Sequence, residues 1–174
     1  IAPSAGRTRR DYFIGLQELF ADIHLHNVSD RYDFDSIRFG IQPFSTAFRG
    51  FLFQDNQLGV RLFGNRANNR YQYNLGWFRK LEKDTNSGLN DPGRALRRDE
   101  FFVANLYAQD TPNLGFTSQI TAVYNRNREG QRGNFYNNNG FIERPASLGF
   151  ERARNYDVLY LGYNGDGHFG KLNL

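Results

Sequence analysis

Residues 101–125 read FFVANLYAQDTPNLGFTSQITAVYN, and this stretch decides the fold class. In Phe101–Gln109 apolar side chains alternate with polar ones, and the alternation returns in Phe116–Asn125. Successive side chains of a β-strand point to opposite faces, so each segment predicts a strand with one apolar and one polar face. The short connection Asp110–Gly115 lies between them and contains Asp, Pro, Asn and Gly. Together the three segments predict an antiparallel strand pair.

Outward from this pair, the same alternation recurs along the chain. The predicted strands are Phe13–His26, Ser36–Pro43, Leu58–Phe63, Tyr71–Phe78, Phe101–Gln109, Phe116–Asn125, Tyr156–Tyr163 and His168–Leu174. The first of them competes with an amphipathic helix over Ile14–Leu25, where apolar residues also recur at helical spacing. We favour a strand there, because the neighbouring segments are β-rich and His24–His26 alternates.

The connections between these strands alternate in length. The short ones are Asn27–Arg31, Gly64–Arg70, Asp110–Gly115 and Asn164–Gly167, and the long ones are Phe44–Gln57, Arg79–Arg98 and Arg126–Asn155. Outer-membrane barrels have short periplasmic turns and longer extracellular loops, whereas a soluble Greek key has no reason to keep that order. The pattern therefore predicts an all-β, antiparallel, up-and-down transmembrane β-barrel with about eight strands visible in this chain.

The direction of the outermost strands predicts that the chain is a segment of a larger barrel. With the short turns in the periplasm, the first strand runs inward and the last runs outward. Bacterial barrels normally keep both termini in the periplasm, so at least one further strand is expected at each end. Residues 1–174 are accordingly expected to form a single β-barrel segment.

Three stretches carry a resemblance to a known family. They are Arg38–Phe44 (RFGIQPF), Phe48–Asn65 (FRGFLFQDNQLGVRLFGN) and Tyr160–Leu174 (YLGYNGDGHFGKLNL). They resemble the strand-and-turn patterns of large porin-like outer-membrane barrels, including the alginate-export type. The resemblance implies a channel for diffusion or export in the outer membrane of a Gram-negative cell, in contact with lipid and lipopolysaccharide. It carries over no individual binding residue.

The composition is compatible with this interpretation. The 174 residues are 39% hydrophobic and 16% aromatic, yet no run of about 20 apolar residues exists to form a membrane-spanning helix. Strands that alternate between lipid and a wet lumen average out to such a polar composition. Tyrosine and tryptophan lie near the ends or on the apolar side of several strands, as at Tyr71, Trp77 and Tyr124. Amphipathic rings of this kind form the interfacial girdles of membrane barrels.

The sequence favours no catalytic chemistry and no cofactor. The absence of Cys excludes a disulfide scaffold, a thiolate zinc site and a cysteine nucleophile. No triad, metallohydrolase or P-loop motif is present, so the chain is not expected to be an enzyme. His24 and His26, with Glu18 and Asp22, fit a metal site by spacing, but a polar lumen wall explains them without an ion. Asn164–Gly167 fits a tight turn better than a calcium loop, because it lacks the other acidic ligands.

Arginine dominates the basic residues and gathers in clusters. The formal net charge is +4, and the clusters are Arg7, Arg9, Arg10; Arg94, Arg97, Arg98; and Arg126, Arg128, Arg132, Arg144, Arg152, Arg154. With interleaved aromatic residues they fit a nucleic-acid groove, but no RNP, KH or helix-turn-helix pattern accompanies them, so no nucleic acid is expected. In a barrel they would lie in the loops or at the pore mouth. There they would attract anions, bind lipopolysaccharide phosphates or pair with nearby carboxylates.

The polar faces of the strands give the predicted pore lining. Its residues are Glu18, Asp22, His24, His26, Arg38, Gln42, Arg61, Gln72, Asn74, Gln119 and Thr121. The function expected from them is a channel for small polar or anionic solutes, formed by this chain alone or in a homo-oligomer or larger membrane assembly. The alternative is a soluble all-β carbohydrate-binding module whose exposed Tyr, Trp and Asn side chains contact sugar.

Overall fold

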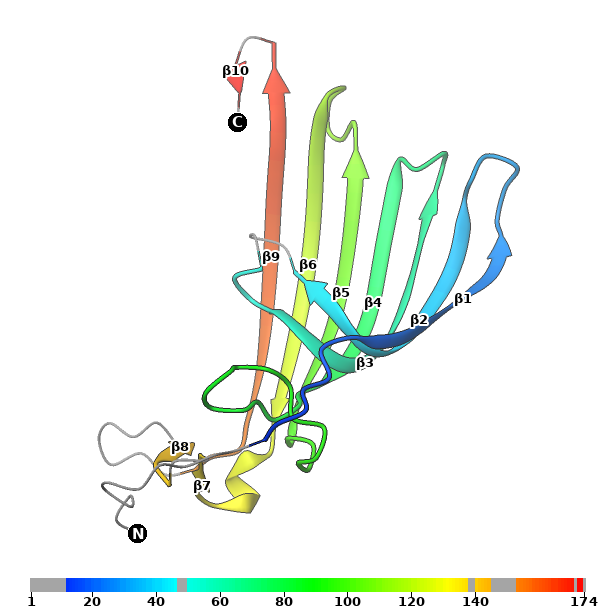
Figure 1. Ribbon diagram of the computed structural model, residues 1–174. Helices are drawn as coiled ribbons and strands as arrows, with labels where there is room; N and C mark the ends of the chain where they lie inside the picture. Colours follow the sequence, from blue (N-terminus) through cyan, green and yellow to red (C-terminus); the bar gives the residue numbers. More distant parts are fainter. Residues whose placement is uncertain (1–11, 47–49, 138–139, 145–152, 171, 174) are drawn as a thin grey trace.

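The fold is a single antiparallel β-sheet. A computed structural model describes residues 12–46, 50–137, 140–144, 153–170 and 172–173 (Figure 1). Its strands are β1 (Leu19–Asn27), β2 (Phe34–Ser45), β3 (Gln54–Arg66), β4 (Tyr71–Arg79), β5 (Asp99–Gln109), β6 (Phe116–Asn127), β7 (Phe135–Tyr136), β8 (Ile142–Arg144), β9 (Tyr156–Phe169) and β10 (Leu172–Asn173). A 3₁₀ turn, η1, spans Glu129–Arg132. No helix among the described residues is long and apolar enough to span a membrane.

The long strands pair in chain order. The order in the sheet is β1-β2-β3-β4-β5-β6-β9-β10, and β7 and β8 form a small separate ladder. Figure 1 shows the β1–β2, β3–β4, β5–β6 and β9–β10 turns at one end of the sheet, and the β4–β5 and β6–β9 connections at the other. The predicted antiparallel, all-β fold is therefore confirmed. Among the described residues the sheet is open, with β1 and β10 at its opposite edges.

Three predicted boundaries are wrong. The first strand begins at Leu19 rather than at Phe13, although it is a strand and not the competing helix. The predicted turn at Asn164–Gly167 is instead the continuation of β9, which pairs with β6 from Asn127↔Tyr156 to Phe116↔Gly167. A Cβ on Gly165 would come within 2.6 Å of the Phe116 ring, so glycine here makes room for an aromatic neighbour. The predicted last strand shrinks to the two residues of β10.

The β2–β3 hairpin bends over one face of the sheet (Figure 1). Its tip brings Phe44 and Phe53 onto Phe78 of β4 and Phe101 of β5, with ring centroids 4.8 Å apart for Phe44–Phe78 and for Phe53–Phe101. Val103 and Val123 complete this cluster, which we call the aromatic core.

Two paired glycines stand beside the aromatic core. Gly40 has a φ of +124° and pairs with Gly59, which in turn pairs with Phe78. A Cβ on Gly59 would come within 2.4 Å of the Trp77 carbonyl and 2.5 Å of the Phe78 ring. The missing side chain of Gly59 lets the fully buried Phe78 lie against the backbone of β3, and that of Gly40 lets β2 lie close to the backbone of Leu19 and Phe20.

The other face of the sheet is apolar and exposed. Its members occupy alternate positions of neighbouring strands and pair in register, as in the row Leu62, Leu75, Ala104, Ala122 and Leu161. The large exposed side chains of this face are Leu19, Ile23, Phe39, Val60, Tyr71, Leu75, Trp77, Phe102, Leu106, Ile120, Tyr124, Leu159, Leu161 and Tyr163. We call this surface the apolar face and the opposite surface the polar face. Water-soluble monomers rarely expose a continuous apolar surface of this extent.

The turns at one end of the sheet are tied together by Asp33. Its carboxylate accepts hydrogen bonds from the Ser29 hydroxyl (2.8 Å) and from the backbone N–H groups of Asn68 (2.9 Å) and Asn69 (3.4 Å). The β1–β2 turn is thereby joined to the β3–β4 turn. Burial raises the pKa of Asp33, but these hydrogen bonds together outweigh burial, and the net pKa lies below its usual value.

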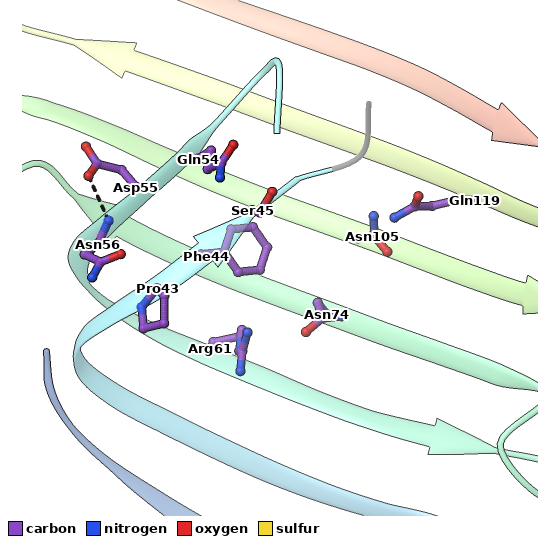
Figure 2. Close-up of a pocket in the computed structure, with 10 residues that line it drawn as sticks. All are labelled: Pro43, Phe44, Ser45, Gln54, Asp55, Asn56, Arg61, Asn74, Asn105 and Gln119. Atoms are coloured by element: carbon purple, nitrogen blue, oxygen red, sulfur yellow. Dashed lines mark hydrogen bonds between the residues drawn. The ribbon is translucent and has the colours of Figure 1, made fainter. Parts of the chain in front are cut away.

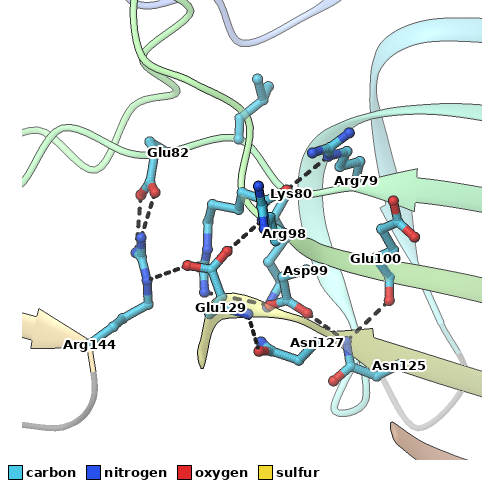
Figure 3. A network of polar contacts seen from close by, with 12 residues as sticks. Arg79, Lys80, Glu82, Arg98, Asp99, Glu100, Asn125, Asn127, Glu129 and Arg144 are labelled. Atoms are coloured by element: carbon cyan, nitrogen blue, oxygen red, sulfur yellow. Dashed lines mark hydrogen bonds and ion pairs between the residues drawn. The ribbon is translucent and has the colours of Figure 1, made fainter. Parts of the chain in front are cut away.

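The connections at the opposite end are joined by buried ion pairs (Figure 3). Arg144 of β8 binds Glu82 through both terminal nitrogens, at 2.5 and 3.0 Å, and donates from Nε to Glu129 at 3.2 Å. Glu129 also accepts from the backbone N–H of Arg98 at 2.5 Å. This network links the β4–β5 connection to the β6–β9 connection. For Arg144, the expectation that clustered arginines pair with nearby carboxylates is confirmed.

Candidate functional site

The polar face collects most of the predicted pore-lining residues. Strand register places nine of them on it: Asp22, His24, Arg38, Gln42, Arg61, Gln72, Asn74, Gln119 and Thr121. Paired residues of neighbouring strands share a face, and the pairs Asp22↔Arg38 and Arg38↔Arg61 carry this assignment across the first three strands. Glu18 lies just before β1, where it accepts a hydrogen bond from Asn56 at 3.3 Å.

His26 is the exception, because the register places it on the other face of the sheet. The register of β1 shifts between His24 and His26, so His24 pairs with Ser36 whereas His26 pairs with Asp35. A β-bulge inserts one residue and reverses the alternation beyond it. His26 therefore belongs to the apolar face, with its Nε2 3.4 Å from Asp35.

Asp35 is the centre of a polar cluster at the turn end of the apolar face. It forms an ion pair with Arg66 (2.8 Å) and accepts a hydrogen bond from the Tyr73 hydroxyl. The expected histidine pair on one face therefore does not form. No group of three or more His, Cys, Asp or Glu able to hold a metal ion is found among the described residues.

A pair of arginines dominates the charge of the polar face. Arg38 is neutralised by Asp22, which accepts from Arg38 Nε at 2.5 Å and from Nη2 at 2.6 Å. Arg61 lies next to Arg38 in register, and its guanidinium stacks 4.6 Å from the centre of the Phe63 ring. Among the described residues no carboxylate lies within ion-pairing distance of Arg61, and its buried Nε has no hydrogen-bond partner. Arg61 is thus a cation of this face without an ion-pair partner among the described residues.

Arg61 lines a cavity of about 340 Å³ on the polar face (Figure 2). The floor consists of side chains from neighbouring strands: Arg61, Asn74, Asn105 and Gln119. The bent β2–β3 hairpin supplies the other wall, from Pro43, Phe44, Ser45, Gln54, Asp55 and Asn56. Amide groups donate and accept hydrogen bonds, so the floor offers one fixed positive charge among groups that bind neutral or anionic polar solutes.

Two rows of polar side chains cross the polar face, and they contribute Asn74, Asn105 and Gln119 to the floor. In one, Asn74 pairs with Asn105, which pairs with Thr121, and the Asn105 amide donates to the Thr121 hydroxyl at 2.7 Å. In the other, Gln72 pairs with Tyr107, which pairs with Gln119. Asn105 and Tyr107 are absent from the predicted pore lining. The alternation of Phe101–Gln109 already puts both residues on the polar side of the predicted strand, so the sequence alone could have identified them.

The aromatic core was missed for a different reason. Phe78 and Phe101 lie on the polar face of β4 and β5. They are on the same side of their strands as Asn74 and Asn105, so side-chain alternation predicts polar residues at their positions. They are covered by Phe44 and Phe53 of the bent hairpin. No local pattern indicates that the hairpin folds onto this face. The aromatic core divides the polar face into a covered part and an open polar part.

Comparison of the chain with protein-family models, with curated proteins and with solved structures finds no match. The arrangement of the two faces is therefore the basis for the functional argument.

Proposed function

We propose that the chain forms part of a porin-like channel in the outer membrane of a Gram-negative cell, for small polar or anionic solutes. The observation that carries the proposal is the two-sided sheet. One face exposes large apolar side chains in register, and the other carries amides, hydroxyls and Arg61, which has no ion-pair partner among the described residues. A membrane barrel needs this division, with apolar residues toward lipid and polar residues toward a water-filled lumen.

The dimensions of the strands support the same proposal. A tilted transmembrane strand needs about 9–11 residues. β4 has 9 residues, β5 has 11 and β6 has 12. Their pairing leaves no gap in the hydrogen-bonded ladder from Tyr71↔Ala108 to Arg79↔Glu100. Backbone groups inside a bilayer must be paired in this way, because no water is present to satisfy them.

The bent hairpin gives the proposed lumen its narrow point. The aromatic core holds the hairpin against the polar face, and the remaining cavity is bordered by Arg61 on one side and by the hairpin on the other. A cation at a constriction favours anions over cations. In water, two unit charges 4 Å apart interact by about 1 kcal/mol, which changes the local anion concentration about fivefold.

The alternative of a soluble carbohydrate-binding module does not account for the apolar face. Such a module needs exposed aromatic rings at its sugar site, and Trp77 and Tyr124 are exposed. These rings, however, lie within a surface that continues through Leu75, Leu106 and Ile120. A surface of this kind in water favours aggregation.

Reconstitution in planar lipid bilayers tests the proposal. The protein is folded in detergent and transferred to bilayers, and the reversal potential is measured under a KCl gradient. We expect copies of the chain to close their open sheets into a barrel and to give stepwise conductance with a preference for chloride, and about a fivefold smaller preference in Arg61→Gln. Arg70→Gln is the matched control, because Arg70 lies in the β3–β4 turn, away from the cavity. A monodisperse protein in plain buffer that produces no conductance would contradict the proposal.

A further inference from the structure

A row of charged residues crosses the apolar face at its long-connection end. Arg79 of β4 pairs with Glu100 of β5, Glu100 pairs with Arg126 of β6, and Arg126 pairs with Asp157 of β9. Each of these positions is two residues along its strand from a member of the apolar face. These charged residues therefore lie on the same side of the sheet as the apolar face, but further along the strands toward the long connections.

The row before it is largely aromatic. Trp77 pairs with Phe102, Phe102 with Tyr124, and Tyr124 with Leu159. Two residues along a strand correspond to about 7 Å, so the charged row lies that far beyond the aromatic row. In a bilayer, aromatic girdles lie at the headgroup level. The charged row thus lies at the depth of the headgroup phosphates.

Arginines outnumber carboxylates around this row. A cavity of about 310 Å³ is lined by Arg79, Arg98, Glu100, Arg126, Arg128 and Gln131. Arg128 is held by Asp157 at 2.7 Å, and Arg98 Nη1 donates to Gln131 at 2.6 Å. Arg79 donates from Nε to the Arg97 carbonyl at 2.8 Å, and its terminal nitrogens make no hydrogen bond or ion pair with another described residue.

Arg126 is the cation of the group without an ion-pair partner among the described residues, although Asp157 lies opposite it in register. Its side chain is exposed and makes no hydrogen bond or ion pair with any residue in the part of the chain that the structure describes. With Asp157 paired to Arg128, Glu100 is the remaining carboxylate facing Arg79, Arg98 and Arg126. Two of these three positive charges are thus left without a carboxylate on the lining.

We infer that this cavity, which we call the rim site, binds the phosphate group of an anionic membrane lipid, and that lipid A of the outer leaflet is its occupant. Guanidinium groups bind phosphate oxygens through paired, charge-assisted hydrogen bonds. The acyl chains of a lipid held there would lie along the aromatic row and the apolar side chains beyond it. The long connections at this end are the ones expected to face outward, which is the side of the outer leaflet.

This inference rests on the proposed function, because it requires the apolar face to be embedded in lipid. The test uses the protein in nanodiscs of phosphatidylcholine with a small fraction of bisphosphorylated lipid A, or of the same lipid without its phosphates. Lipid A retained by the protein after transfer to detergent is counted by native mass spectrometry. We expect at least about tenfold greater retention of the phosphorylated form, and loss of that excess in Arg79→Gln/Arg126→Gln.

Arg70→Gln, at the opposite end of the sheet, is the control and should retain lipid A as the unchanged protein does. Equal retention of both lipid forms, or undiminished retention in the double variant, would overturn the inference. Displacement of lipid A by excess inorganic phosphate would assign the site to a free anion and would also overturn it. Quenching of the single tryptophan, Trp77, by spin-labelled lipid reports insertion separately. A protein with quenched Trp77 and no lipid A preference therefore refutes the rim site alone.

Discussion

The aromatic core predicts a large difference between two phenylalanines of the same hairpin. Phe53 is 5% exposed and its ring lies 4.8 Å from Phe101 and 5.6 Å from Phe78, whereas Phe51 is 86% exposed. Replacing a buried phenylalanine by alanine removes its burial and leaves a cavity, at a cost of about 3–5 kcal/mol. Removing an exposed side chain changes the free energy of unfolding by about 0.5 kcal/mol or less.

The assay is urea unfolding of the protein in lipid vesicles, followed by Trp77 fluorescence. With a denaturant dependence of about 2 kcal/mol per molar urea, Phe53→Ala should lower the midpoint by about 1.5–2.5 M. Phe51→Ala should shift the midpoint by about 0.3 M or less. Phe53→Ala should also raise the single-channel conductance, because the hairpin loses its anchor on the polar face. Equal midpoints for the two variants would refute the reasoning.

Three further predictions follow from other contacts. Gly59→Ala should destabilise the protein by about 1–3 kcal/mol in the same urea assay, because its Cβ would meet the Trp77 carbonyl at 2.4 Å. The lowered pKa of Asp33 means that its stabilisation is fully present above the unfolded pKa of about 3.9 and is lost as the pH falls through the lower folded value. The amide chemical shifts of Asn68 and Asn69 should therefore titrate below about pH 4, and Asp33→Asn should abolish that titration. Trp77 fluorescence should be quenched more strongly by spin labels near the headgroup than by labels at the acyl-chain end, and the reverse order would contradict its interfacial depth.

The sequence predicts the central strands well because their side chains alternate without interruption. The segments Tyr71–Phe78, Phe101–Gln109 and Phe116–Asn125 each lie within an observed strand to within a few residues. The partners of these strands also follow from chain order, since short turns join β3 to β4 and β5 to β6. Alternation is a local property, and it sets the face of each side chain without reference to the rest of the fold.

The misses arise where a distant contact overrides the local pattern. Asn164–Gly167 has strong turn propensity, but twelve registered pairs with β6 carry β9 straight through it. The bulge before His26 changes the face of one side chain without leaving a sequence signal. Arg61 is recognisable as a polar-face residue from alternation. Its lack of a carboxylate partner depends on Asp22 binding Arg38 instead, which only the three-strand register reveals.

Cysteine accessibility tests the membrane orientation of the two faces most directly. The chain has no Cys, so single cysteines report without background. On β4 and β6, the neighbours Asn74 and Leu75, and Gln119 and Ile120, point to opposite faces. In vesicles, a charged thiol reagent should label Asn74→Cys and Gln119→Cys and leave Leu75→Cys and Ile120→Cys unlabelled. Labelling of Leu75→Cys and Ile120→Cys at the same rate as their neighbours would contradict a lipid-embedded apolar face.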